Sequence, residues 1–267
     1  MKNASYFTSK LRRGEVCLGS GISFADPTVT EALSGLLDFA WIDMEHNAYS
    51  LETVQAHIMA TKGTETTALV RVPENNAATI KTVLDIGADG IIVPMVRTAA
   101  DVRRAVAACR YPPEGMRGFG PRRPIDHGLS ADAGYSQRAN EAIIAIAQIE
   151  QIEAVNNLDE ILAVPGLNAV VIGGNDLSGS MGLMGQPHHP DVAAAIETVI
   201  EKSRQAGVFV GIGLADDPEK MAEWLDKGMQ WLQVGVDWWL LMRSAQTIIG
   251  DLRAIIAAGA AENQTKE

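Results

Sequence analysis

Seven side chains that could take part in chemistry lie at the ends of short apolar runs of this sequence or just after them. They are Asp43, Glu45, His46, Arg71, Gln148, Glu150 and Asp176. An unpaired carboxylate that is buried costs several kcal/mol, so acids in such positions need a cation or hydrogen-bond donors beside them. A histidine among them can move protons near neutral pH. The set therefore indicates acid–base or metal-assisted chemistry.

Glu150 and Asp176 are the candidate metal ligands, because carboxylate oxygens suit Mg2+, Mn2+ or a similar divalent ion. The chain has no H-E-x-x-H motif and no cysteine cluster, which disfavours a structural zinc site. The alternative is an ion-pair network in which Arg71 neutralises the acids without any metal.

His46 is the candidate base, and Asp43 or Asp85 could hold its ring and raise its basicity. The alternative is a core histidine whose ring is hydrogen-bonded and takes no part in catalysis. His57, in a helical segment, is predicted to lie at the surface or between subunits. The pair His188-His189 is predicted to lie in a loop before a helix.

Eight apolar runs alternate with helical segments along the chain. The runs are 16–22, 39–45, 67–72, 90–96, 143–150, 168–174, 208–214 and 231–237. Most are rich in valine and isoleucine without polar alternation, which is typical of parallel strands covered on both faces. The count predicts a (β/α)8 barrel, in which strand carboxyl ends gather the reactive groups on one rim. A doubly wound open sheet is the alternative, but G-S-G-I-S-F does not complete its G-x-G-x-x-G turn.

The whole chain, 1–267, is predicted to be one domain, with no boundary inside it. The segment 111–141 is rich in proline and glycine and is predicted to be a long loop at the barrel mouth. The tail after about Ile256 is expected to fray.

Composition narrows the class of protein. The chain has 267 residues and a formal net charge of −11, which argues against a general binder of nucleic acid or anionic membranes. Cys17 and Cys109 do not form a disulfide framework and are expected to be free, buried thiols. The sequence shows no apolar signal core and no run of about 20 apolar residues, so we expect a cytoplasmic protein.

Several motifs together resemble one known family. They include D-M-E-H-N, L-V-R-V-P-E-N, Y-P-P-E-G-M-R-G-F-G, A-Q-I-E, I-G-G-N-D-L-S-G-S-M-G and V-G-V-D. In this order, and over nearly the whole chain, they resemble the HpcH/HpaI aldolase family of metal-dependent pyruvate aldolases. One departure is Gly173-Gly174-Asn175-Asp176, where many members have G-P-x-D-L; the turn is expected to be looser.

The resemblance implies a role for each site residue. His46 would be the catalytic base, acting through water, with Asp85 and Asp43 raising its basicity. Arg71 would steady the enolate oxygen. The remaining roles fall to Glu150 and Asp176 as metal ligands, Gln148 as a substrate contact, and the turn from Gly173 with the amides of Asn175 and Asp176 as a carboxylate cradle.

The implied reaction is the reversible cleavage of 4-hydroxy-2-oxo acids to pyruvate, or a related 2-oxo acid, and an aldehyde through a metal-stabilised enolate. The implied ion is Mg2+, Mn2+ or Co2+, with Zn2+ less favoured. The alternatives are oxaloacetate decarboxylation, citrate-lyase-like cleavage by the same site, and a barrel that only binds a ligand or metal. A Schiff base is disfavoured because none of the eight lysines falls on a predicted strand.

Two further features concern partners. Arg122 and Arg123 are predicted either to reach an anionic group on the aldehyde or to face a subunit contact or water. Trp238-Trp239 open the last helix, which by resemblance packs on, or is swapped with, a neighbouring subunit. The resemblance also implies a homohexamer built as a trimer of dimers. The alternative is that this apolar stretch is buried against its own barrel.

Overall fold

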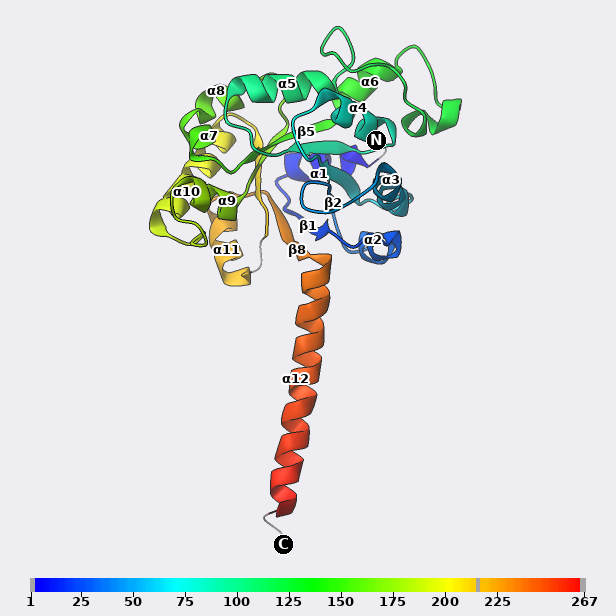
Figure 1. Ribbon diagram of the computed structural model, residues 1–267. Coiled ribbons are helices and arrows are strands. Elements are labelled where there is room, and N and C mark those ends of the chain that lie inside the picture. Colours follow the sequence, from blue (N-terminus) through cyan, green and yellow to red (C-terminus); the bar gives the residue numbers. More distant parts are fainter. Residues whose placement is uncertain (1–2, 215–216, 265–267) are drawn as a thin grey trace.

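The computed structural model describes residues 3–214 and 217–264, and side chains as far as residue 258. Eight parallel strands close into a barrel in sequence order, with β8 pairing back to β1 (Figure 1). The strands are β1 (Cys17–Ile22), β2 (Phe39–Asp43), β3 (Thr67–Arg71), β4 (Gly90–Val93), β5 (Ile144–Ile149), β6 (Ala169–Ile172), β7 (Phe209–Ile212) and β8 (Trp231–Val236). All eight predicted runs are strands, so the predicted (β/α)8 barrel is confirmed.

Helices cover the outside of the barrel. They are α2 (Pro27–Ser34), α3 (Leu51–Ala60), α4 (Ala77–Asp85), α5 (Ala99–Cys109), α6 (Tyr135–Ala142), α7 (Ile152–Asn156), α8 (Leu158–Leu162), α9 (Gly174–Ser180), α10 (Pro190–Gln205) and α11 (Pro218–Asp226). Local sequence sets their ends: the Ser50 hydroxyl accepts a hydrogen bond from the Thr53 amide (3.2 Å) at the start of α3. Gly87, with φ +112°, follows the end of α4.

An aromatic cluster fills the amino-terminal end of the barrel. Phe7, on α1 (Ala4–Arg12), meets Phe39 and Trp231 edge to face, with ring centroids 5.6 Å apart in both pairs. The Phe39 and Trp231 rings lie 5.4 Å from each other, and all three side chains are buried. Helix α1 therefore closes this end, and the opposite rim is left for the site.

The segment 111–141 lies at the amino-terminal end of the barrel, so its predicted place at the mouth is wrong. It follows α5 and leads through a short 3-10 helix, η1 (Arg123–Gly128), and α6 into the start of β5. Helices that return alongside a parallel sheet end near the amino ends of its strands. Figure 1 shows α6 on the side of the barrel away from the base of the last helix.

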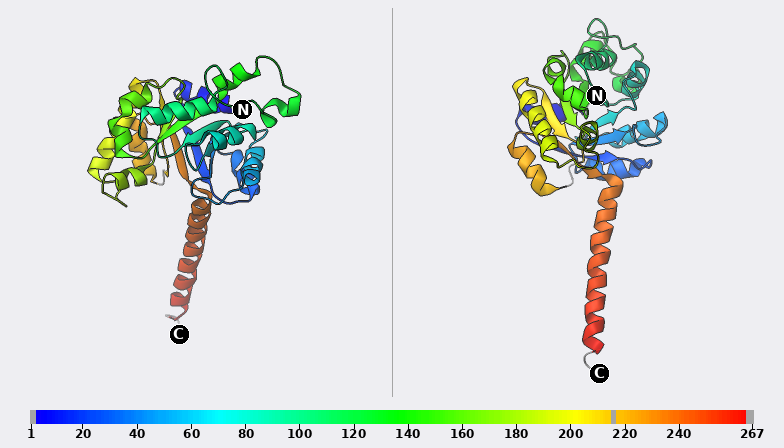
Figure 2. Two further views of the ribbon diagram at one scale, coloured as in Figure 1. Left: turned by 45° about the horizontal axis from the view of Figure 1, so that its top comes forward. Right: turned by 60° about the vertical axis from the view of Figure 1, so that its left-hand side comes forward.

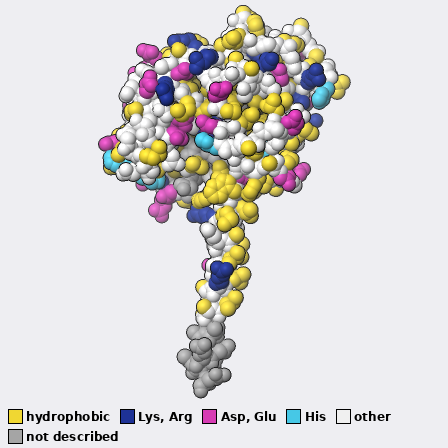
Figure 3. Space-filling view, in the orientation of Figure 1, with side chains coloured by type: hydrophobic (Ala, Val, Ile, Leu, Met, Phe, Trp, Pro, Cys, Tyr) yellow, Lys and Arg dark blue, Asp and Glu magenta, His cyan; other side chains and the backbone are white. Residues whose placement is uncertain are grey.

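The last helix, α12 (Asp237–Gln264), leaves the carboxyl end of β8 and projects from the barrel (Figure 2). It continues past Ile256 as a helix to Gln264, and the fraying expected after Ile256 stays a prediction. Many of its apolar side chains are exposed and visible along its length in Figure 3. Within the described residues, no helix has the length and apolar character needed to cross a membrane.

His57 is fully buried, so its predicted position at the surface or between subunits is wrong for this chain. Its Nδ1 lies 2.8 Å from the Thr30 hydroxyl, and its ring packs on Tyr49. Burial lowers the pKa of His57 from its usual 6.5, although Asp237 acts in the opposite direction.

The aromatic cluster provides a stability prediction. We expect Phe7→Ala to lower the free energy of unfolding by about 3–5 kcal/mol, because it removes a buried ring and leaves a cavity. Urea denaturation followed by circular dichroism measures the change. Tyr6→Ala, on the exposed face of the same helix, is the control and should cost less than about 0.5 kcal/mol. Equal losses in both variants would contradict the role of the cluster.

His57 provides a prediction of pH dependence. Between its lowered folded pKa and 6.5 the unfolded chain holds more protons, so the free energy of unfolding should rise with pH through that window and level off above it. His57→Gln should lose this part of the rise. Urea denaturation of both proteins between about pH 5 and 8 tests it, since other groups titrate alike in the two. Curves that stay parallel across the window would contradict the prediction.

Candidate functional site

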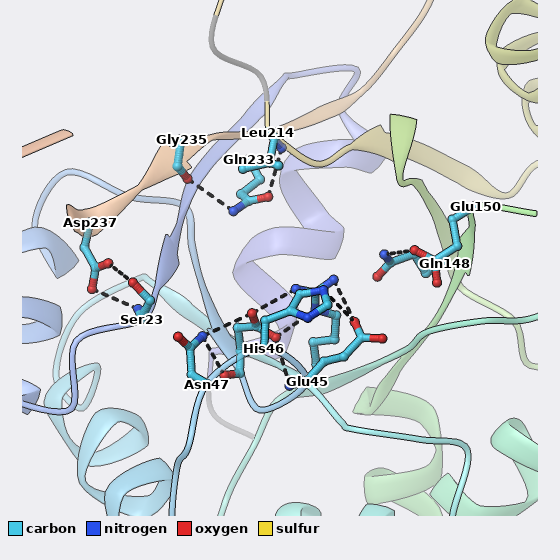
Figure 4. Close-up of polar contacts among 12 residues, drawn as sticks. Ser23, Glu45, His46, Asn47, Gln148, Glu150, Leu214, Gln233, Gly235 and Asp237 are labelled. Atoms are coloured by element: carbon cyan, nitrogen blue, oxygen red, sulfur yellow. Dashed lines mark hydrogen bonds and ion pairs between the residues drawn. The ribbon is translucent and has the colours of Figure 1, made fainter. Parts of the chain in front are cut away.

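A cavity of about 590 Å3 lies at the carboxyl ends of the strands. Its lining includes Asp43, Arg71, Gln148 and Asp176, from the ends of four strands or the turns that follow them. His46 also faces it. The structure therefore brings together rim residues that follow β2, β3, β5 and β6. Figure 4 shows Glu45 and His46 on one side and Gln148 and Glu150 on the other.

Arg71 is held by two carboxylates. Its Nε and one terminal nitrogen donate to the two oxygens of Asp43, each at 2.8 Å, and its other terminal nitrogen lies 2.8 Å from Glu45 Oε2. Its guanidinium also lies over the Trp41 ring, 5.3 Å from the centroid. The geometry follows from the fold, because Asp43 and Arg71 are register partners on adjacent strands. This arrangement fixes the position of one positive charge at the rim.

His46 is exposed and points toward the cavity. Among the described residues, the carboxylate within 4 Å of its ring belongs to Glu45, with 3.7 Å between Nε2 and Oε2. Asp43 is engaged instead by Arg71, by the Glu45 amide (3.0 Å) and by the side chain of Asn47 (3.1 Å). The prediction that Asp43 holds the ring is therefore wrong in this structure.

Asp85 is also not beside His46. It ends α4, near the amino end of β4, and pairs with the buried guanidinium of Arg117 at 2.6 Å. Because α4 runs back along the barrel, its last residue lies away from the rim where β2 ends. Within one chain Asp85 therefore does not contact His46, and the role expected for it stays a prediction.

Glu150 is almost fully buried and is oriented from two sides. Its Oε1 accepts a hydrogen bond from the Met95 amide at 2.6 Å, and its Oε2 accepts one from Gln148. Met95 has φ +56°, a conformation that is uncommon for a residue other than glycine and is often found at functional sites. A Cβ on Gly173 would lie 2.8 Å from Glu150 Oε2, so glycine there lets the carboxylate approach the turn.

Burial and neighbouring charges change the pKa values of two rim carboxylates. Burial raises the pKa of Glu150 to about 7, the Met95 amide acts to lower it, and the charges of Glu45 and Asp176 raise it further. Burial also raises the pKa of Glu45, with Arg71 acting against that. Negative charge at the rim is therefore in excess of what Arg71 alone neutralises.

This excess and the donor atoms present fit a divalent ion. Glu150 and Asp176 offer carboxylate oxygens, and Gln148 Oε1 is buried without a hydrogen-bond partner. Hard oxygen donors of this kind suit Mg2+ or Mn2+. In the described part of the chain, no three His, Cys, Asp or Glu side chains are already grouped as a metal site.

The turn after β6 begins α9 with Gly174, Asn175 and Asp176. The first bond of this helix runs from the Leu177 amide to the Gly173 carbonyl at 2.9 Å, so the amides before it are not used within the helix. This geometry is compatible with the carboxylate cradle expected from the resemblance, whose role stays a prediction.

A wall formed by β8 was not predicted from the sequence. Gln233 accepts a hydrogen bond from the Leu214 amide at 3.0 Å and donates one to the Gly235 carbonyl at 3.2 Å (Figure 4). Asp237, where β8 meets α12, accepts from the amides of Ser23 and Phe24, both at 2.9 Å. The motif V-G-V-D was the available signal, because its glycine and acid follow directly after a predicted strand.

The lysines and the pair Arg122-Arg123 lie away from the cavity. No lysine in the described residues lies on a strand or lines the cavity, as expected if a Schiff base is not formed. Arg122 and Arg123 lie at the start of η1, at the amino-terminal end of the barrel. The prediction that they reach the aldehyde is therefore wrong for the cavity of their own chain.

Comparisons with known proteins agree with this site and fold. Residues 25–244 match the model of the HpcH/HpaI aldolase/citrate lyase family. A 4-hydroxy-2-oxo-heptane-1,7-dioate aldolase of Salmonella paratyphi C is 39% identical over 219 residues, 82% of each chain.

Two solved structures share the fold at similar coverage. A family protein from Burkholderia cenocepacia aligns with a TM-score of 0.86 and 29% identity, over 92% of this chain and 98% of its own. The citrate synthase SbnG aligns with a TM-score of 0.83 and 30% identity, over 93% and 98% of the two chains. This chain therefore belongs to the HpcH/HpaI aldolase/citrate lyase family, as its motifs predicted.

Proposed function

We propose that the protein is a metal-dependent aldolase that reversibly cleaves 4-hydroxy-2-oxo acids to pyruvate, or a related 2-oxo acid, and an aldehyde. The observation that carries the proposal is the rim itself: an ordered guanidinium, a histidine and an excess of carboxylates around one cavity. The aldolase name of the Salmonella relative supports the same enzyme class. That support favours the aldolase over the decarboxylase and citrate-lyase-like alternatives.

Glu150 and Asp176 would hold the divalent ion, with Gln148 beside them. When bound, such an ion supplies Lewis-acid polarisation of the 2-oxo acid. The chain's own contribution is to fix these oxygens: the Met95 amide and Gln148 orient Glu150 before any ligand arrives. The amides of Asn175 and Asp176 would bind the substrate carboxylate.

Arg71 would face the oxygen on which negative charge develops as the enolate forms. Its three contacts with Asp43 and Glu45 prevent it from swinging away, so little reorganisation accompanies the reaction. His46, exposed and lining the cavity, would take the methyl proton of pyruvate through water. In cleavage, the same base would take the proton of the 4-hydroxyl group.

The oligomeric state and the cellular location of the protein are also parts of this proposal. The exposed apolar side chains along α12 are the kind of surface that packs on another chain, which supports the expected homohexamer. We keep a cytoplasmic location as a prediction.

Metal removal tests the function directly. We expect exhaustive chelation to abolish both pyruvate–aldehyde condensation and deuterium exchange into the pyruvate methyl group, and added Mg2+, Mn2+ or Co2+ to restore both. Mass spectrometry of pyruvate in heavy water measures the exchange. Treatment with borohydride and pyruvate should leave no lysine adduct. Full activity after chelation, or a lysine adduct, would defeat the proposed mechanism.

His46 gives a second prediction for the same exchange. We expect His46→Gln to slow it by about 100-fold or more, because the proton acceptor is lost. His188→Gln is the matched control, since His188 is an exposed histidine that lines the same cavity but has no part in the mechanism. Metal binding, measured by calorimetry, should be similar in both variants. An unchanged rate in His46→Gln would remove it from the role of base.

A further inference from the structure

The cavity has two chemically different walls. The acids and Arg71 come from β2, β3, β5 and β6, whereas the wall formed by β7, α11 and the start of α12 is apolar. We call this second region the apolar lobe and define it as Leu214, Met221, Trp224, Trp238 and Trp239. Figure 3 shows hydrophobic side chains gathered where α12 leaves the barrel. No role in the proposed enolate chemistry uses this lobe.

The lobe presents apolar surface that the fold has not hidden. Leu214 and Trp238 are about half exposed, at 50% and 48%. Leu214 has φ +56° and is kept there by the hydrogen bond from its amide to Gln233. A leucine held in a left-handed conformation and still exposed has no evident structural benefit, and such strain is typical of ligand-binding positions.

Cationic side chains are scarce in the described lining of the cavity. Among the described residues that line the cavity, Arg71 is the single arginine or lysine, and Asp43 and Glu45 already engage it. Lys220 and Lys227 lie against the Trp224 ring, but they pair with glutamates and do not line the cavity.

Arg243 stacks on Trp239 and likewise does not line the cavity. A second carboxylate on a substrate would therefore lose part of its hydration against apolar side chains in the lobe, without a cation among the described lining residues to compensate.

The volume leaves room for a substantial group in the lobe. A cavity of about 590 Å3 is in the range that holds drug-sized ligands, far more than a three-carbon acid requires. We propose that the acceptor aldehyde carries an uncharged apolar group, branched aliphatic or aromatic, which binds in the apolar lobe. This inference rests on the proposed function and specifies its substrate class, in contrast to the dioate in the name of the Salmonella relative.

Two aldehydes of matched size test the proposal. 4-Methylpentanal and 4-oxobutanoate have the same number of heavy atoms, but only the second ends in a carboxylate. In condensation with pyruvate we expect kcat/KM to be about tenfold or more higher for 4-methylpentanal, a typical selectivity for an apolar pocket. Equal values, or a preference for 4-oxobutanoate, would overturn the proposal.

Variants locate the selectivity. Trp238→Arg places a cation in the lobe. It should lower the ratio of kcat/KM for 4-methylpentanal to kcat/KM for 4-oxobutanoate by about tenfold or more. Leu241→Arg, on the same helix but outside the cavity lining, is the matched control and should leave the ratio unchanged. Both variants would disturb an assembly built on α12, so a change confined to Trp238→Arg reports on the lobe; equal changes in both would overturn the assignment.

A gentler variant covers the case in which Trp238→Arg does not fold. Leu214→Ala should lower kcat/KM for 4-methylpentanal severalfold and leave that for 4-oxobutanoate nearly unchanged. An equal loss for both aldehydes would count against the lobe. Deuterium exchange into pyruvate without aldehyde distinguishes failure of the lobe proposal from failure of the proposed function. If exchange occurs but the apolar aldehyde is not preferred, only the lobe proposal is contradicted. If neither exchange nor condensation occurs, the aldolase proposal is contradicted as well.

Discussion

Negative charge in excess at the mouth of the barrel is the constraint on which the site depends. Four carboxylates, Asp43, Glu45, Glu150 and Asp176, share the rim with one guanidinium, that of Arg71. Two of them neutralise Arg71 and fix it in place. Burial raises the pKa of Glu150, and the nearby charges of Glu45 and Asp176 raise it further. A buried carboxylate destabilises a fold unless a positive charge or hydrogen-bond donors compensate it. Here a bound divalent cation would supply the missing positive charge.

The sequence predicted the barrel and most of the rim because both depend on short-range patterns. Runs of valine and isoleucine mark the strands, and a polar residue directly behind a run must lie at a carboxyl end once all strands are parallel. The position of 111–141 could not be obtained in that way, because it depends on whether a helix precedes the segment. Thr98 and Asp101 form a capping box that starts α5. With that helix recognised, the segment falls at the far end of the barrel, where Asp85 at the end of α4 also lies.

Backbone conformation was beyond the reach of the sequence. Met95 and Leu214 both have φ +56°, and neither residue type suggests it. Each uses its amide to orient a side chain inside the barrel, Glu150 in one case and Gln233 in the other. Residue-type patterns report side chains, whereas here the donors are main-chain groups placed by tertiary structure. Gly173 was a partial indication in the sequence, since a glycine directly before a polar turn often marks a backbone that another group approaches closely. Here that group is the Glu150 carboxylate.

The two walls of the cavity divide the chemistry between different parts of the barrel. Strands β2, β3, β5 and β6 carry the charged groups suited to forming an enolate, and the end of β7, α11 and the start of α12 carry the apolar surface. Relatives with the same barrel bear the names of an aldolase and of a citrate synthase. A carbon nucleophile made on one wall can attack whatever carbonyl the other wall binds. In such an arrangement the acceptor can change through the apolar wall alone, while the charge balance that makes the nucleophile stays intact.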